Sequence, residues 1–151
     1  MKNLLRCFVV ASFLMAAANS FSADLRLIQA VKSVDVQAVR SLISQRVDVN
    51  ATDVDSSTAL HWAAQRNNPE IVDLLLAAGA NAKAVTRYNV TPLALACMNG
   101  NEVIIERLLK AGADANGASE EGQTALMTAA LNGRVSAIKA LLAHGAEIDA
   151  K

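Results

Sequence analysis

The sequence of 151 residues is poor in aromatic side chains and in cysteine. It has three Phe, one Trp and one Tyr, and all three Phe lie within residues 1–22. The chain after that point therefore has Trp62 and Tyr88 as its aromatic residues, and Cys97 as its cysteine. A chain that has lost residues 1–22 can form no internal disulfide, so the packing of aliphatic side chains must stabilise it.

The sequence also lacks an excess of positive charge, with 14 Lys+Arg balanced by 14 Asp+Glu. Without a basic patch, we expect no nucleic acid partner. The glycines are isolated and form no GxGxxG or GxxxxGK[ST] run, so a phosphate-binding loop is not indicated. His61, His144 and Cys97 have no metal-ligand spacing. We expect no metal and no cofactor.

The strongly hydrophobic stretch of the chain is its N-terminus. Lys2 and Arg6 precede an uncharged run that includes 12 apolar and small residues, 7–18, and small residues follow it. This order is typical of a secretory signal peptide, whereas a membrane-spanning helix needs about 20 apolar residues. We therefore predict a signal peptide at residues 1–22, with cleavage after Ser22 or after Ser20.

The short cationic start is typical of a bacterial signal peptide, so we expect an exported, periplasmic protein. No membrane span would remain after cleavage. Loss of Lys2 and Arg6 leaves 12 basic and 14 acidic residues, a formal net charge of −2.

A heptapeptide recurs three times at a fixed step. TALHWAA begins at Thr58, TPLALAC at Thr91 and TALMTAA at Thr124, each 33 residues after the last. Glycines and leucines keep the same step: Gly79, Gly112 and Gly145; Leu75, Leu108 and Leu141. Self-similarity at this period is typical of a solenoid, in which each unit packs on its neighbours.

Each unit has the signals of two helices joined by a turn. Thr91 can cap the first helix with Pro92 at its first position. Gly100 and Gly133 can adopt positive φ where the first helix ends, and Asn67 tolerates that conformation. The sequence 68–70, Asn-Pro-Glu, can open the second helix.

The period of 33, the T-P/A-L-x-x-A-A helix start and the LLLAAGAN and LLKAGADAN helix ends closely resemble ankyrin repeats. The resemblance covers residues 23–151 and implies an all-α repeat solenoid of helix-turn-helix units joined by β-hairpin loops. We place a degenerate N-terminal unit at residues 23–52 and ankyrin repeats at 53–85, 86–118 and 119–151.

The first unit departs from the pattern at two turns. Val34 stands where the other units have Asn or Gly, and Arg46 stands where they have Gly. A β-branched residue is unfavourable at positive φ. We therefore expect the turns of this unit to differ or to be looser.

The C-terminus has no polar capping unit, because Ile138, Leu141 and Leu142 follow the internal pattern. We expect a fragment of a longer repeat array. The alternative is a short array whose last face is covered by a partner or by a second copy, so self-association through the uncapped end stays open.

The residues with catalytic potential have structural explanations. His61 has no nucleophile or metal partner in its context, and the resemblance implies that it bonds locally where loop meets helix. Trp62 falls on a helix-packing position, and Cys97 replaces a small core residue. Glu120 and Glu121 are adjacent in a loop and do not face each other across a cleft. We expect no catalytic residues and no enzyme activity.

By resemblance, the hairpin tips and the exposed side of the first helices form a concave binding surface. Tyr88 and Arg87 are the best candidate anchors, because Tyr and Arg are enriched in interface hot spots. The candidate partner-binding residues are Asp55, Gln65, Arg66, Arg87, Tyr88, Met98, Asn99, Glu120, Glu121 and Gln123.

The sequence therefore predicts a non-enzymatic protein–protein interaction module in the cell envelope. The first alternative is a docking arm of a longer protein whose C-terminal part carries an enzyme or effector domain. The second is a structural array that self-associates.

Overall fold

A computed structural model describes residues 25–149. The predicted signal peptide, residues 1–22, lies outside the described residues. A helix over residues 25–32 begins the described part. The helices that follow are α2 (Val36–Ser44), α3 (Ala59–Gln65), α4 (Pro69–Ala77), α5 (Pro92–Asn99), α6 (Glu102–Lys110), α7 (Ala125–Leu131) and α8 (Val135–Ala143).

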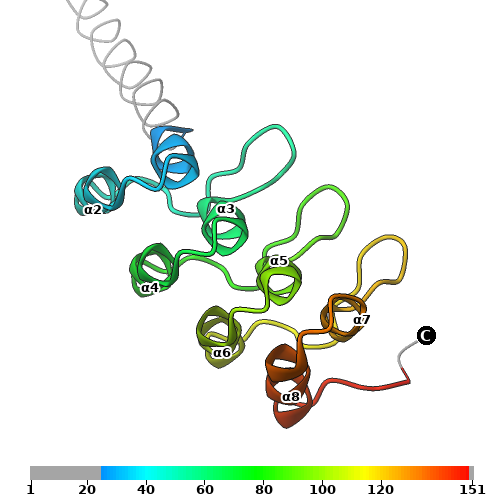
Figure 1. Cartoon of the computed structure of the whole chain (residues 1–151). Coiled ribbons are helices and arrows are strands. Elements are labelled where there is room, and N and C mark those ends of the chain that lie inside the picture. Colours follow the sequence, from blue (N-terminus) through cyan, green and yellow to red (C-terminus); the bar gives the residue numbers. More distant parts are fainter. Residues whose placement is uncertain (1–24, 150–151) are drawn as a thin grey trace, which may run out of the picture.

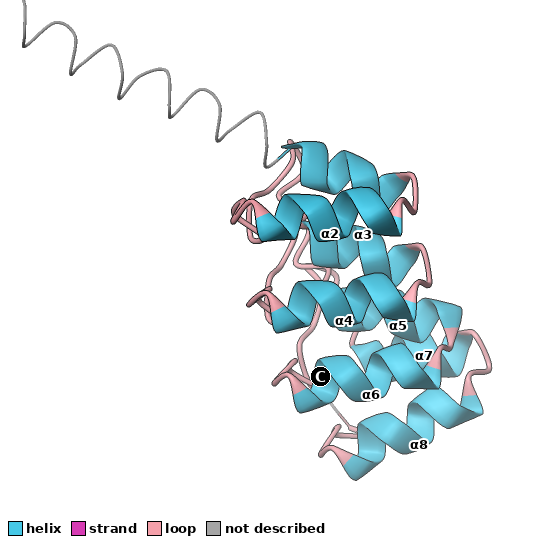
Figure 2. Ribbon diagram, turned by 90° about the vertical axis from the view of Figure 1, so that its left-hand side faces the viewer, coloured by secondary structure: helices cyan, strands magenta, loops and turns pink. Residues whose placement is uncertain are grey.

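The helices form two rows. The first helices of successive units, α3, α5 and α7, lie side by side in one row, and the second helices, α2, α4, α6 and α8, form the other (Figures 1 and 2). A long loop precedes each of α3, α5 and α7 and projects from the row of first helices (Figure 1). We call these loops fingers. The predicted all-α repeat solenoid is confirmed.

The helix starts follow the sequence signals. The Thr91 hydroxyl accepts a hydrogen bond from the Ala94 N–H at 3.1 Å, with Pro92 at the first helical position. The Asn68 side chain accepts from the Ile71 N–H at 3.0 Å and opens α4 in the same way. Each cap satisfies a backbone donor that has no partner within its helix. The predicted caps are confirmed.

The turns between helices share one backbone conformation. Gly100 and Gly133 adopt φ of 75° and 63°, and Asn67 adopts 56°, as predicted. The expectation for the first unit is wrong, because Val34 and Arg46 adopt φ of 59° and 58° there. Packing of the helix pair against the next unit fixes the turn geometry, and these two side chains accept the strain.

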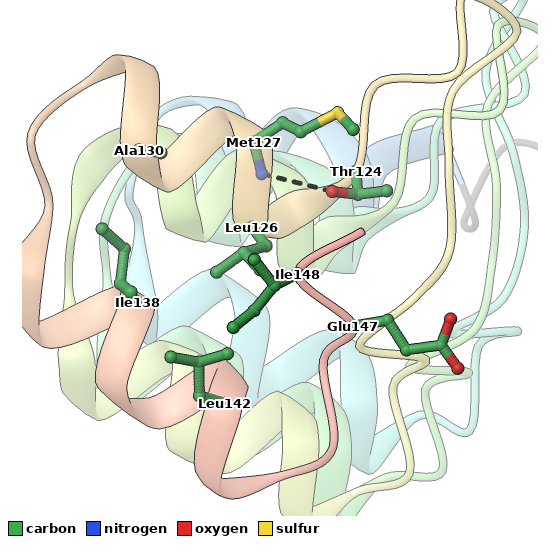
Figure 3. Close-up of a pocket in the computed structure, with 8 residues that line it drawn as sticks. All are labelled: Thr124, Leu126, Met127, Ala130, Ile138, Leu142, Glu147 and Ile148. Carbon is green, nitrogen blue, oxygen red and sulfur yellow. Dashed lines mark hydrogen bonds between the residues drawn. The ribbon is translucent and has the colours of Figure 1, made fainter. Parts of the chain in front are cut away.

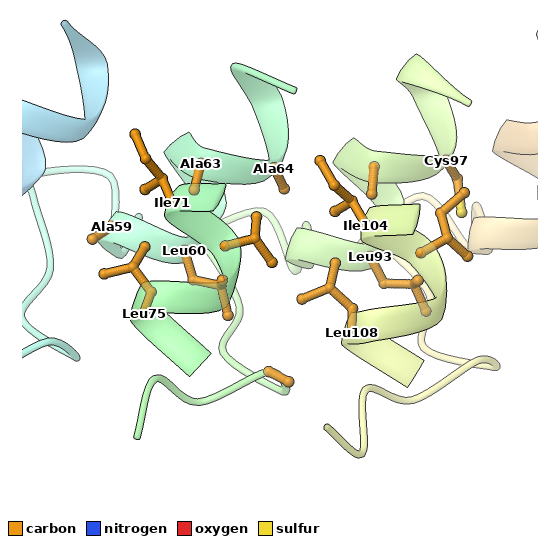
Figure 4. Packing of buried hydrophobic residues seen from close by; sticks show 14 of the residues in the cluster. Ala59, Leu60, Ala63, Ala64, Ile71, Leu75, Leu93, Cys97, Ile104 and Leu108 are labelled. Carbon is orange, nitrogen blue, oxygen red and sulfur yellow. The ribbon is translucent and has the colours of Figure 1, made fainter. Parts of the chain in front are cut away.

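The core repeats with the units. Leu60 and Leu93 occupy equivalent places in α3 and α5, and both are fully buried. In the second helices, Leu75 and Leu108 pack beneath them in the same arrangement (Figure 4). Alanines at the helix contacts, such as Ala63 with no exposed surface, let adjacent helices approach closely.

The fingers are tighter than the hairpins we predicted, and residues 25–149 contain no β-strand. Isolated antiparallel bridges join Thr52 to Thr58 and Ala118 to Thr124. Across each finger, a backbone N–H donates to a carbonyl at 3.0 Å: Asp53 to Ser57, Thr86 to Val90, and Ser119 to Gln123. A second backbone bond closes each turn, from Ser56 to Asp53, from Asn89 to Thr86 and from Gly122 to Ser119.

Within the described residues, each helix is too short or too polar to cross a lipid bilayer.

Candidate functional site

Two hollows lie between the fingers and the first helices. The first has a volume of about 230 Å³ and the second about 90 Å³. The first hollow is lined by Asp55, Ser57, His61, Trp62, Gln65, Thr86, Tyr88, Val90 and Leu95. The second is lined by Asn89, Val90, Thr91, Ala94, Leu95, Met98, Gly117, Ser119, Gln123 and Thr128. Val90 and Leu95 line both, so the two hollows are adjacent, and we call the pair the concave groove.

The second hollow repeats the first, one unit further along the chain. Seven residues of the first have an equivalent in the second at a step of 33 residues. The pairs are Ser57 and Val90, His61 and Ala94, Trp62 and Leu95, Gln65 and Met98, Thr86 and Ser119, Val90 and Gln123, and Leu95 and Thr128. The groove is therefore a property of the repeat, and its chemistry changes from unit to unit.

Neighbouring fingers are bonded to each other near their tips. The Arg87 N–H donates to the Asp55 carbonyl at 3.1 Å, and the Glu120 N–H donates to the Tyr88 carbonyl at 3.3 Å. The Arg87 guanidinium also contacts the Asp55 carboxylate at 3.0 Å and donates to the carbonyl of Val54. These bonds hold the row of fingers as one surface.

Tyr88 lies on the second of the three fingers. Its side chain is 56% exposed, and the Arg87 guanidinium lies 5.9 Å from the centre of its ring. A cation over an aromatic face is favourable and orients both groups. The two predicted anchors are therefore adjacent, exposed and directed by their neighbours.

Trp62, on the floor of the first hollow, is held between two charged groups. Its indole N–H donates to an Asp53 carboxylate oxygen at 3.0 Å, and the Lys32 ammonium lies 3.9 Å from its ring centre. The same carboxylate oxygen contacts Lys32 at 3.4 Å. Burial acts to raise the pKa of Asp53, but hydrogen bonds from Asp55, Ser57, Trp62 and Lys32 outweigh it and hold that pKa below 3.8.

His61 connects two units. Its Nδ1 accepts from the Thr58 N–H at 3.1 Å, so Nε2 carries the proton and donates to the Val90 carbonyl at 3.1 Å. Burial lowers the pKa of His61 below 6.5, against the opposing effect of its carbonyl partners. Both ring nitrogens are engaged, as the structural interpretation of this residue expects.

Cys97 is fully buried, and burial raises the pKa of its thiol to about 12. Such a thiol carries almost no thiolate near neutral pH and packs as a small apolar side chain. Among the described residues, no group of three His, Cys, Asp or Glu side chains is arranged to hold a metal ion.

The candidate residues predicted from the sequence divide by position. Asp55, Gln65 and Tyr88 line the first hollow, and Met98 and Gln123 line the second. Arg87 joins the finger tips, while Arg66, Glu120 and Glu121 are exposed nearby. Asn99 is half-buried, and its amide donates to the carbonyls of Ala64 and Gln65 at 3.0 and 3.1 Å, so it braces α3 against α5.

The sequence prediction missed part of the groove. Leu95 and Thr86 line it, and Lys32 and Asp53 orient its Trp. The 33-residue alignment could have found Leu95, because Trp62 stands at the same position. Nothing in the repeat pattern marks Lys32, because its contact with Trp62 joins two different units.

The C-terminal end of the stack has an apolar face. A hollow of about 290 Å³ is formed by Leu126, Ile138, Leu142 and Ile148, with Glu147 at its edge (Figure 3). Ile148 is 79% exposed. One unit earlier, the equivalents of Ile138 and Leu142, which are Ile105 and Leu109 on α6, are buried, and α6 packs against α8.

The N-terminal end of the stack is polar by comparison. Arg26 is exposed at the position where Ala59 and Ala125 are buried, and Gln29 is exposed at the position of Trp62. Within residues 25–149, the two ends of the stack therefore differ: the first unit presents the polar Arg26 and Gln29, and the last presents apolar side chains.

Comparison with known proteins gives the same repeat. The sequence matches the family described as Ankyrin repeats (3 copies) over residues 27–118 and 78–151. The chain is 37% identical over 68 residues to the human Ankyrin repeat domain-containing protein 40, a match that covers 44% of this chain and 18% of that protein. It is 42% identical over 60 residues to the palmitoyltransferase akr1 of Schizosaccharomyces pombe, covering 39% of this chain and 9% of the enzyme.

A third relative is human Neurogenic locus notch homolog protein 2, with 54% identity over 43 residues, 28% of this chain and 2% of that protein. Each of these matches spans less than a fifth of the relative's length. The relatives differ widely in kind, and what they have in common with this chain is the repeat. With the family match extending over residues 27–151 and the repeat geometry described above, the chain belongs to the ankyrin-repeat family.

Proposed function

We propose that this chain is a non-enzymatic module of the cell envelope, which binds another protein through the concave groove and the finger tips. Ankyrin repeats are in general protein–protein interaction modules. The observation that carries the proposal is the groove itself, in which two repeat-related hollows are joined into one surface by finger-to-finger hydrogen bonds.

The chemistry of the groove favours binding over catalysis. Both ring nitrogens of His61 are bonded, and the Cys97 thiol is buried away from the groove surface. What the groove does offer is an exposed Tyr beside an Arg at its rim and a half-buried Trp on its floor. These residue types dominate the energetics of protein interfaces.

Site-specific crosslinking in cells tests the proposed face. A photoreactive residue at position 88 should capture a protein, while the same residue at Ala77, exposed on α4 at the far side of the stack, should not. Tyr88→Ala should then weaken binding of the captured protein by about tenfold or more without lowering stability. Equal capture from both positions, or unchanged affinity of the Tyr88 variant, would refute this face as the interface.

The proposed location in the envelope rests on the signal-peptide pattern of residues 1–22. Its test is fractionation of a bacterial host together with mass determination of the N-terminus. We expect a periplasmic product that begins at Phe21 if cleavage follows Ser20, or at Ala23 if cleavage follows Ser22. An intact N-terminus in the cytosolic fraction would contradict export.

Two other functions have support in particular observations. The second candidate is a docking arm of a longer protein that carries an enzyme or effector domain. It is favoured because each relative named above is far longer than the part that matches this chain. The downstream coding sequence decides it. The apolar C-terminal face favours a third, a self-associating array, which light scattering with and without an added polar capping unit would test.

A further inference from the structure

The spacing of the two hollows follows from the packing of the helices. The hollows are equivalent positions of successive units, and their floors are formed by α3 and α5, which pack side by side. Packed helices have axes about 8–10 Å apart. A partner that fills both hollows must therefore present two side chains at about that separation.

We propose that the concave groove binds an extended, proline-rich segment in the polyproline II conformation, with apolar side chains at positions i and i+3. This inference rests on the proposed function and specifies the partner's chemistry. Polyproline II rises about 3.1 Å per residue with three residues per turn, so i and i+3 lie on one face about 9 Å apart. A β-strand offers about 7 Å at i+2 or about 13 Å at i+4, and fits neither.

The side chains of the first hollow suit a proline-rich ligand. Trp62 and Tyr88 both line it, and grooves lined by aromatic rings are the usual docking sites for proline-rich segments. The indole N–H of Trp62 is bonded to Asp53, and the Lys32 ammonium lies 3.9 Å from the ring centre, so the ring is held in place. The part of the ring that lines the hollow is the surface that the ligand would contact. The larger apolar side chain of the segment belongs here.

The second hollow is smaller and lacks an aromatic ring. Ala94, Leu95 and Met98 replace His61, Trp62 and Gln65 of the first. A volume of about 90 Å³ with these walls suits an aliphatic side chain such as Leu or Val. The groove therefore distinguishes the two apolar positions of the ligand by size.

The rim of the groove supplies polar groups for an extended backbone. Within residues 25–149, the side-chain amides of Gln65 and Gln123 make no hydrogen bond, although both line the groove. The carbonyls of a polyproline II segment are free to accept from them, whereas those of an α-helix are already bonded. This favours an extended ligand over a helical one that presents side chains at i and i+7.

Charge adds a third element of recognition. Glu120 and Glu121 are exposed on the finger that borders the second hollow, and no cation of the described residues forms an ion pair with either. A Lys or Arg beyond the second apolar side chain of the ligand would lie near these carboxylates. Binding should accordingly weaken as the salt concentration rises.

The test uses fluorescent peptides of known sequence. Three proline-based probes of one composition carry two Leu and one Arg, with the Leu residues at i and i+2, i and i+3, or i and i+4. A fourth probe is an alanine-based helix with Leu at i and i+7. By fluorescence anisotropy with the full chain, the i, i+3 probe should bind about tenfold more tightly than the other three.

Substitutions show where the probe binds. Gln65→Trp and Met98→Trp place a large ring at equivalent exposed positions over the first and second hollows, and each should weaken binding of the i, i+3 probe about tenfold. Ala77→Trp, on the exposed side of α4, is the matched control and should leave affinity unchanged.

Several results would overturn the inference: equal affinity for all spacings, tighter binding of the helical probe, no binding of any probe, or equal effects of the three Trp substitutions. None of these would refute the proposed function, because crosslinking from position 88 could still capture a folded partner. Failure of that crosslinking would refute the proposed function itself.

Discussion

The Nε2 atom of His61 lies 3.1 Å from the carbonyl oxygen of Val90, so the start of α3 is bonded to the finger of the next unit. The other ring nitrogen accepts from the Thr58 N–H, which begins the same helix. One neutral imidazole therefore joins a helix start to the following unit. Ala94 and Met127, at the equivalent positions of α5 and α7, make no such connection.

Removing this imidazole should destabilise the chain. His61→Ala leaves the Thr58 N–H without its acceptor and removes one of the two donors to the Val90 carbonyl, which keeps the Thr86 N–H. The expected cost is about 1–3 kcal/mol in the free energy of unfolding. Urea denaturation measures it. His144→Ala, an exposed histidine near Glu106, is the matched control and should change stability by less than about 0.5 kcal/mol.

The same histidine gives stability a dependence on pH. Its pKa is lowered below 6.5 in the folded chain, so below pH 6.5 the unfolded chain binds the proton first. Stability should therefore fall as the pH drops from about 6.5 towards the folded pKa, by at most about 1.4 kcal/mol per pH unit. The slope should vanish in His61→Ala and persist in His144→Ala. A slope that His61→Ala retains would assign it to other groups.

Two turns of the first unit offer a gain in stability. Val34 is a β-branched residue at φ 59°, a left-handed conformation that costs about 1–2 kcal/mol for most residues. Asn tolerates it, as Asn67 does at the equivalent position. Val34→Asn should raise the free energy of unfolding by about 0.5–1.5 kcal/mol. Val103→Asn, at an exposed position within α6, is the control and should give no gain.

Those turns also show where prediction from the sequence stops. The step of 33 residues, the Thr91 cap and the positive φ of Gly100 are local signals, and each was correct. The prediction for the turn at Val34 was wrong. It relied on the local preference of Val against positive φ, whereas the packing of the unit against its neighbour decided the geometry.

The candidate site also has a part that the sequence predicts and a part that it does not. Tyr88 and Gln65 were predicted to lie on the concave face because repeat position alone places them there. The contact of Lys32 with Trp62 and the ion pair of Arg87 with Asp55 connect residues about one unit apart with different side chains in each unit. Such contacts depend on side-chain directions in the folded stack, which a repeat pattern does not contain.

The core and the exposed surface of the stack should respond differently to truncation. Leu108 has no exposed surface, whereas Leu131 is 77% exposed on the last unit. Leu108→Ala should cost about 2–5 kcal/mol in the free energy of unfolding, through lost burial and the cavity left behind. Leu131→Ala should cost less than about 0.5 kcal/mol. Urea denaturation measures both, and similar losses for the two variants would contradict the stacked arrangement.

Asp53 should contribute to stability through its four donors. Its carboxylate accepts from the backbone of Asp55 and Ser57 at 3.0 and 3.1 Å, from the Trp62 indole at 3.0 Å and from Lys32 at 3.4 Å. Asp53→Asn places an NH₂ group against some of these donors, so we expect a loss of about 1–3 kcal/mol. Asp55→Asn, at a half-exposed ion pair with Arg87, is the control and should cost less than about 1 kcal/mol.

The lowered pKa of Asp53 predicts the direction of its pH dependence. Because the folded pKa lies below 3.8, the contribution is complete above that pH and is lost as the pH falls through the folded pKa. Trp62 is the sole Trp of the chain, and its indole bonds to Asp53, so its fluorescence reports on this contact. Its emission should change on acidification below pH 3.8 in the wild type. Asp53→Asn should remove that change while the chain stays folded by circular dichroism, and its persistence would show that the carboxylate does not hold the indole.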